Sequence, residues 1–129
     1  MTSDSFDPDL VLVVDDISEN LELAHVYLKK LGWRVLTSDS GEHALRTLGT
    51  VTPAWILLDI KMPGIDGLAL AKILRSARRY DNTRIVGYTA HALKDEVINI
   101  LASGFDSVLI KPITYADISD SFGANVQVM

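Results

Sequence analysis

Four short apolar runs, spread along the chain, each end directly in a polar residue that can hold a metal ion or a phosphoryl group. Runs of this length without alternating polar residues are typical of strands buried on both faces of a parallel sheet. The carboxyl ends of parallel strands meet at one edge of the sheet, which is where ligands bind. Five side chains should therefore converge at that edge: Asp15, Asp16, Asp59, Thr89 and Lys111.

Segments with helical periodicity alternate with these runs, which is the pattern of βα units. A further short strand is expected at residues 34–38. Helices are expected at residues 18–31, 39–49, 66–77 and 91–103, and over about two turns from residue 114. Asp66 should cap the third helix, and Ile73 and Leu101 should face the core. The fold class is therefore α/β, with five βα units and a doubly wound five-stranded parallel sheet.

The chain is expected to form one domain. Its 129 residues are near the usual size of a single domain, and no linker rich in Pro, Gly or Ser divides it. We expect residues 1–9 to be a flexible N-terminal segment, residues 10–122 to be the domain, and residues 123–129 to be a C-terminal tail.

Composition argues against several classes of function. A net charge of −5 disfavours a broad electrostatic grip on nucleic acid, so no nucleic-acid partner is expected. No apolar stretch approaches the roughly 20 residues needed to span a bilayer, and the polar N-terminus lacks a secretory signal. The absence of cysteine excludes disulfides and thiolate metal sites. We therefore expect a cytoplasmic protein without membrane insertion.

Three clustered carboxylates require a compensating positive charge. Two unit negative charges about 5 Å apart repel by roughly 3 kcal/mol at an effective dielectric constant of 20. Mg²⁺ is the natural partner, because it prefers oxygen ligands and is often shared between carboxylates and phosphate oxygens. Lys111 can add a point positive charge, and Thr89 can donate a hydrogen bond to an anionic oxygen. A carboxylate such as Asp59 can then accept a phosphoryl group.

The segments at residues 13–16, 57–67, 88–90 and 110–112 together resemble the receiver domain of bacterial two-component response regulators, in particular stand-alone receivers of the chemotaxis type. The resemblance covers residues 10–122 and implies a flavodoxin-like receiver fold. It implies that Asp59 is the phosphoacceptor, that Asp16 binds Mg²⁺ directly and that Asp15 binds it through water. The backbone carbonyl of Lys61 would complete the metal ligands. Thr89 and Lys111 would bind the phosphoryl group, and a cis peptide bond would precede Pro112.

The resemblance also implies partners. The phosphoryl donor would be a sensor histidine kinase or a histidine phosphotransfer protein, which would dock near Ile17, Asn20 and Leu23. A downstream protein target would bind the face formed by the fourth helix, the fifth strand and the fifth helix, which is also available for a homodimer. That face would include Lys94, Asp95, Ile98, Phe105, Ile118 and Phe122.

In such a protein, the domain catalyses its own phosphorylation and a slow dephosphorylation, and it is not a metabolic enzyme. Lys61 and His91 occupy positions that resemble those tuning the access of the hydrolytic water, and two bulky basic side chains predict slow hydrolysis. One position departs from the family pattern: Val108 stands where receivers often carry a rotating Tyr or Phe. The output is therefore expected either to be weaker or to pass through Thr89 and the loop that follows it.

Three other functions are compatible with an α/β fold. An aspartate-nucleophile phosphatase would need a second acidic residue at the position of Ile17, and a dinucleotide-binding domain would need a Gly-rich loop after the first strand. Neither pattern is present. The remaining alternative is a phosphorylation-independent protein-interaction module of the same fold. The sequence does not distinguish a terminal switch from a member of a phosphorelay.

Overall fold

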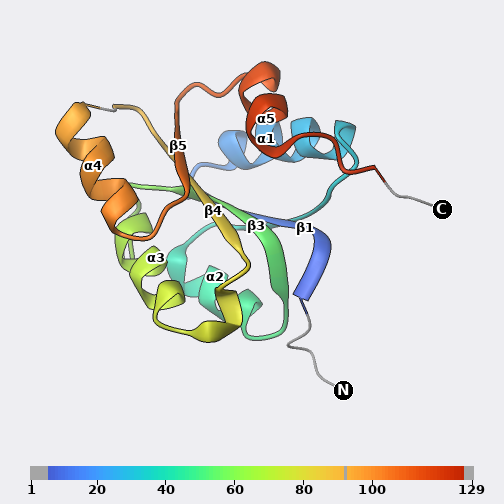
Figure 1. Ribbon diagram of the computed structural model, residues 1–129. Helices are drawn as coiled ribbons and strands as arrows, with labels where there is room; N and C mark the ends of the chain where they lie inside the picture. Colours follow the sequence, from blue (N-terminus) through green and yellow to red (C-terminus); the bar gives the residue numbers. More distant parts are fainter. Residues whose placement is uncertain (1–5, 92, 127–129) are drawn as a thin grey trace.

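The apolar runs form the strands of one parallel sheet in the order β2-β1-β3-β4-β5 (Figure 1). This computed structural model describes residues 6–91 and 93–126. The strands are β1 (Phe6–Val14), β2 (Arg34–Ser38), β3 (Thr52–Asp59), β4 (Arg84–Thr89) and β5 (Ser107–Ile110). The helices are α1 (Ser18–Lys30), α2 (Gly41–Leu48), α3 (Gly67–Arg75), α4 (Lys94–Ala102) and α5 (Tyr115–Phe122), with a 3₁₀ turn η1 (Arg78–Tyr80) before β4. The doubly wound α/β fold predicted from the sequence is confirmed.

The helices cover both faces of the sheet, with α1 and α5 on one side and α2, α3 and α4 on the other (Figure 1). Successive side chains of a strand point to opposite faces, so each buried strand supplies both layers. In β1, Leu12 and Val14 pack into the cluster under α2, α3 and α4, whereas Val11 and Val13 pack into the cluster under α1 and α5. This double burial explains why the strands read as unbroken apolar runs.

The first strand is longer than expected. Phe6 and Asp7 pair with Thr52 and Pro53 of β3, and the register shifts between Asp7 and Val11. Asp7 also makes a 2.8 Å ion pair with Arg34. The expectation of a flexible segment therefore does not hold for residues 6–9, while residues 1–5 lie outside the described residues.

The chain after α5 folds back onto the edge of the sheet where the strands begin. The backbone N–H of Asn125 donates to the carbonyl of Leu31 at 2.7 Å, and its side-chain amide donates to the carboxylate of Asp9 and the carbonyl of Gly32, both at 3.2 Å. The indole N–H of Trp33 donates to the carbonyl of Gly123. The tail is thus held as far as Asn125, and residues 127–129 lie outside the described residues.

Several details of the helices were predicted correctly. The side chain of Asp66 accepts a hydrogen bond from the backbone N–H of Ala69, which makes it the N-cap of α3. Helix α5 has eight residues, about two turns, and Thr114 and Asp117 form a reciprocal capping box at its start. The peptide bond between Lys111 and Pro112 is cis, as expected.

Other details were wrong. Helix α4 begins at Lys94 and not at His91, because the preceding Leu93 has an extended backbone and acts as the N-cap. Ile73 and Leu101 are 44% and 43% exposed. In α3 the stripe that faces the sheet is formed by Leu70, Ala71 and Leu74, which leaves Ile73 beside it. Among the described residues, no helix has both the length and the apolar character needed to cross a membrane.

Candidate functional site

The carboxyl ends of β1, β3, β4 and β5 bring the predicted polar residues into one acidic pocket at a single edge of the sheet. Carboxylate oxygens of Asp15, Asp16 and Asp59 all lie within 4.8 Å of one another. The ammonium nitrogen of Lys111 lies 3.2 Å from Oδ1 of Asp59 and 3.4 Å from Oδ2 of Asp15. The charged residues that follow the strands therefore lie together in this pocket, as predicted from the sequence.

Asp15 and Asp16 are consecutive but have different surroundings. Asp15 is completely buried and continues the β1–β2 ladder, because its N–H donates to the carbonyl of Ser38. Its Oδ1 accepts from the backbone N–H of Ile17, and its Oδ2 accepts from the side-chain amide of Asn20, both at 2.9 Å. Asp16 is exposed. The pocket thus has a buried, hydrogen-bonded inner carboxylate and an outer one at the solvent.

The pKa of Asp15 reflects opposing effects. Burial raises it, but the hydroxyl of Tyr88, the N–H of Ile17, the positive charge of Lys111 and the amide of Asn20 all stabilise the carboxylate. Together they hold the pKa of Asp15 below its ordinary value. Asp15 is therefore an anion at neutral pH although no solvent reaches it.

Asp59 ends β3 and is only 3% exposed. Burial and, to a smaller extent, the nearby negative charge of Asp15 raise the pKa of its carboxyl group to about 6, although Lys111 and the backbone N–H of Lys61 oppose this rise. The loop after β3 returns so closely that a Cβ atom on Gly67 would lie 2.2 Å from the backbone oxygen of Asp59. A residue without a side chain is therefore required at position 67 to keep the carboxylate in place.

Lys111 and Thr89 complete the pocket. The N–H of Lys111 donates to the carbonyl of Thr89 at 2.8 Å, which ties the end of β5 to the end of β4. Thr89 is 4% exposed, and its hydroxyl oxygen accepts a long hydrogen bond, 3.4 Å, from the backbone N–H of His91. Lys61 is exposed, and its N–H donates to Asp59 at 3.3 Å. Both loops after β3 and β4 thus begin at the acidic pocket.

Tyr88 also belongs to this pocket, and the sequence did not assign it there. It is completely buried, its hydroxyl donates to Oδ2 of Asp15, and the ammonium of Lys111 lies 4.7 Å from the centre of its ring. Burial and the hydrogen bond to Asp15 raise the pKa of Tyr88, so the hydroxyl stays protonated. A signal was present, because a tyrosine in an otherwise aliphatic buried strand needs a partner for its hydroxyl.

The chemistry of the pocket fits a hard divalent cation. Its candidate ligands are oxygens only, from three carboxylates, and Asp16 leaves it open to solvent. Mg²⁺ prefers such a set and keeps several of its own waters. The two buried carboxylates share a single ammonium group, so a further positive charge would relieve their repulsion.

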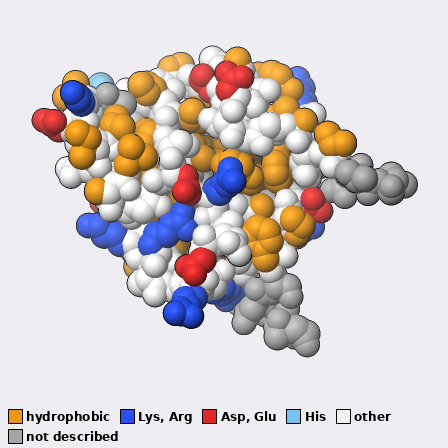
Figure 2. All heavy atoms as spheres, in the orientation of Figure 1, with side chains coloured by type: hydrophobic (Ala, Val, Ile, Leu, Met, Phe, Trp, Pro, Cys, Tyr) orange, Lys and Arg blue, Asp and Glu red, His pale blue; other side chains and the backbone are white. Residues whose placement is uncertain are grey.

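The expected partner face needs correction. Phe105, Ile118 and Phe122 are 5%, 0% and 6% exposed, so they belong to the core and cannot contact a partner. Lys94, Asp95 and Ile98 are exposed, as expected. Among the described residues of this region, the large apolar side chains that are exposed are instead Leu93, Ile98, Leu101, Ile110 and Tyr115. Figure 2 shows hydrophobic side chains between charged ones over α4. Val108 is partly buried and packs against the core under α4.

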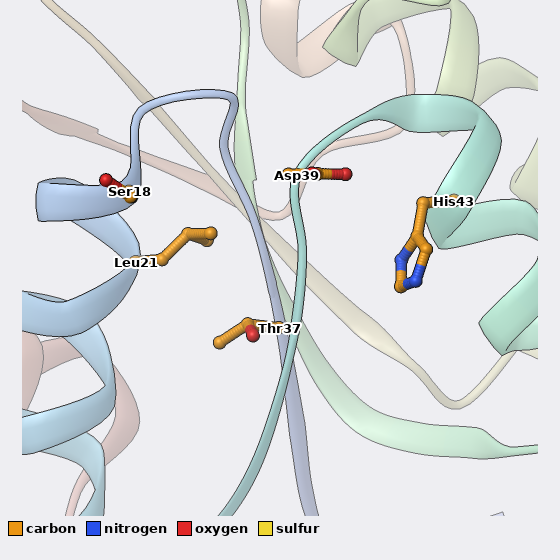
Figure 3. Close-up of a pocket in the computed structure, with 5 residues that line it drawn as sticks. All are labelled: Ser18, Leu21, Thr37, Asp39 and His43. Carbon is orange, nitrogen blue, oxygen red and sulfur yellow. The ribbon is translucent and has the colours of Figure 1, made fainter.

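A shallow hollow of about 340 Å³ lies between the start of α1, the end of β2 and the start of α2 (Figure 3). It is lined by Ser18, Leu21, Thr37, Asp39 and His43. The Nδ1 atom of His43 lies 2.8 Å from the hydroxyl of Ser38, and Ser38 is buried. Of the expected donor-docking residues, Ile17 is 47% exposed, whereas Asn20 and Leu23 are half-buried.

Comparison with known proteins gives a consistent result. A family model described as "Response regulator receiver domain" matches residues 11–122. The chain is 43% identical over 108 residues to the virulence sensor protein BvgS of Bordetella pertussis, covering 80% of this chain and 9% of that protein. It is 38% identical over 113 residues to the sensor histidine kinase RcsC of Salmonella typhimurium, covering 88% of this chain and 12% of that protein. The chain thus spans about a tenth of the length of these curated relatives.

Solved structures agree with the sequence relatives. The chemotaxis protein CheY4 of Vibrio cholerae superimposes with a TM-score of 0.80 at 27% identity, over 89% of this chain and 96% of that one. A putative response regulator from Chloroflexus aurantiacus gives a TM-score of 0.82 at 28% identity, over 88% and 93% of the two chains.

Proposed function

We propose that this chain, which belongs to the family of response regulator receiver domains, accepts a phosphoryl group on Asp59 and then changes its protein contacts or passes the group on. One observation carries the proposal: the buried Asp59 carboxylate shares the ammonium of Lys111 with Asp15, in a pocket lined by a third carboxylate. A buried acid held beside a lysine in this way is suited to act as an acceptor.

Asp15, Asp16, Asp59 and the backbone carbonyl of Lys61 would hold Mg²⁺. When bound, the ion neutralises the charge that gathers on the carboxylate and phosphoryl oxygens. The donor set described above fits this role, because it supplies only oxygen atoms and includes one carboxylate at the solvent.

The residues of the chain perform the transfer as follows. An oxygen of the Asp59 carboxylate attacks phosphorus, so that a P–O bond forms while the P–N bond of a phosphohistidine breaks and the imidazole leaves with the electron pair. Asp59 gives up no proton, because above a pH of about 6 its carboxyl group is ionised. Lys111 then pairs with a phosphoryl oxygen, and the hydroxyl of Thr89 donates to another. Slow hydrolysis would follow if Lys61 and His91 restrict the attacking water.

The donor would be a sensor histidine kinase or a histidine phosphotransfer protein. The relatives support this class of partner, since both BvgS and RcsC are named as sensors. Docking near Ile17, Asn20 and Leu23 would bring the donor beside the acidic pocket. The same relatives favour a role in a phosphorelay, and the exposed apolar residues of α4 and β5 provide a surface for a downstream protein or a second copy of this chain. These steps belong in the cytoplasm.

Intact-mass measurement after incubation with acetyl phosphate tests the proposal. The chain should gain one phosphoryl mass in the presence of Mg²⁺ and none when the metal is chelated. Asp59→Asn should gain none under either condition. Asp120→Asn is the matched control, because Asp120 is an exposed residue of α5 away from the pocket, and it should behave as the unsubstituted chain does. A chain that never gains the mass would instead be a phosphorylation-independent interaction module.

A further inference from the structure

Tyr88 makes a contact that the transfer chemistry does not require. Its hydroxyl donates to Oδ2 of Asp15, and its ring packs in the apolar layer under α1 and α5. Tyr88 therefore reaches the acidic pocket from inside the core, whereas a metal ion would approach from the solvent side, where Asp16 is exposed.

Both carboxylate oxygens of Asp15 accept hydrogen bonds. Oδ1 accepts from the N–H of Ile17, and Oδ2 accepts from Asn20 and from Tyr88 and also faces the ammonium of Lys111 at 3.4 Å. A carboxylate oxygen has about two acceptor positions, so Oδ2 is already saturated, whereas Oδ1 carries one donor. A water carried by a metal ion can bond to Oδ2 only if one of these donors leaves.

We propose that Tyr88 is a positioning residue that lowers the affinity of the acidic pocket for Mg²⁺, because its hydroxyl occupies an acceptor position on Oδ2 of Asp15 that a metal-bound water would otherwise use. The inference rests on the proposed function, in which Asp15 binds the ion through water. A donated hydrogen bond also withdraws negative charge from the carboxylate, which weakens its attraction for a cation.

Loss of the hydroxyl alone should not free the Asp15 side chain. The N–H of Ile17 and the amide of Asn20 still hold one oxygen each, and Lys111 stays nearby. The phenyl ring of a Tyr88→Phe variant would still pack in the same layer and lie under Lys111. The variant therefore changes the number of donors on Asp15 and little else.

Tyr80 supplies a matched control. It is also a buried tyrosine, and its hydroxyl donates to a neutral acceptor, the backbone carbonyl of Leu48, at 2.9 Å. It packs in the layer under α2, α3 and α4, on the other face of the sheet. Tyr80→Phe thus removes a buried tyrosine hydroxyl, as Tyr88→Phe does, without touching the pocket.

The test is calorimetric titration of the whole chain with MgCl₂, without any phosphoryl donor. Tyr88→Phe should bind Mg²⁺ about tenfold more tightly than the unsubstituted chain, as expected when one hydrogen bond to a charged group no longer competes. Tyr80→Phe should bind with unchanged affinity. Asn20→Ala, which removes a donor to the same oxygen from a half-buried position, should also bind more tightly. A merely structural role for the Tyr88 hydroxyl would not tighten metal binding.

Equal or weaker binding by folded Tyr88→Phe would overturn the inference. If that variant does not fold, weaker binding by Asn20→Ala overturns it, because the donors would then serve to orient Asp15 for the metal. The proposed function fails separately: a chain that binds no Mg²⁺ overturns both ideas, whereas a chain that binds Mg²⁺ and is phosphorylated with no change in affinity in Tyr88→Phe overturns only the role of Tyr88.

Discussion

Replacing Asp59 with asparagine should stabilise the metal-free chain at neutral pH, although it removes the acceptor. The ionised carboxylate of Asp59 is buried beside that of Asp15, and the two share one ammonium group. Asparagine has nearly the same shape and carries no charge, and Lys111 can still pair with Asp15. The substitution therefore removes a buried negative charge and leaves no buried cation unpaired.

The pKa of Asp59 gives the magnitude and the pH dependence. It is raised from an ordinary 3.8 to about 6 in the folded chain. Between these values the folded state binds more protons than the unfolded state, so stability is lost as the pH rises through this window. At 1.36 kcal/mol per pKa unit, the full cost of the ionised carboxylate is ~3 kcal/mol at pH 7, and about 1 kcal/mol of it is already present at pH 4.5. Asp59→Asn should avoid this cost.

Urea unfolding without divalent cations measures the effect. Relative to the unsubstituted chain, Asp59→Asn should gain about 1 kcal/mol at pH 4.5 and about 3 kcal/mol at pH 7, with an unchanged slope against urea. Asp120→Asn, which changes an exposed carboxylate of α5, should differ from the unsubstituted chain by less than about 0.5 kcal/mol at both pH values. The reasoning is refuted if Asp59→Asn is less stable at pH 7, or if its advantage does not grow with pH.

Four further outcomes are expected. Gly67→Ala should lower the free energy of unfolding by at least ~2 kcal/mol, because its Cβ would lie 2.2 Å from the backbone oxygen of Asp59; an unchanged urea midpoint would contradict this. Lys111→Met should cost ~3 kcal/mol in metal-free urea unfolding at pH 7, since two buried carboxylates lose their cation, and much of the loss should be restored at pH 4.5. Asn125→Ala should cost about 1 kcal/mol in the same assay by releasing the tail from Asp9. Amide exchange measured by mass spectrometry should change more in α4 than in α3 on phosphorylation, and equal changes would argue against α4 as the responding element.

The sequence predicted the acidic pocket well because both of its signals are local. A buried strand is visible as an unbroken apolar run, and the polar residue that ends the run is adjacent in the chain. Strand order was not needed, since all parallel strands end at the same edge. The convergence of Asp15, Asp59 and Lys111 at one edge of the sheet therefore followed from three independent local patterns.

What the sequence did not reveal depends on contacts between distant residues. Tyr88 and Asp15 are 73 positions apart in the sequence. They meet because only one strand, β3, lies between β1 and β4 in the sheet. The early start of β1 likewise depends on the pairing of Phe6 with Thr52, which the polar residues around Pro8 conceal. The error at Ile73 has a different cause. The helical period predicted for α3 was correct, but the period alone does not say how wide a stripe of the helix surface the sheet covers.

The burial of the helices indicates how a change in the acidic pocket could reach the surface. Helix α3 buries Leu70, Ala71 and Leu74, whereas α4 has a single fully buried residue, Ile100, among its described side chains. An element with few buried contacts needs less free energy to move. Helix α4 also follows Thr89 after a short loop, and the Leu93 that caps it is 69% exposed. A shift of Thr89 toward a phosphoryl group would therefore displace α4 and its exposed apolar side chains more readily than α3. This route needs no aromatic residue at the position of Val108.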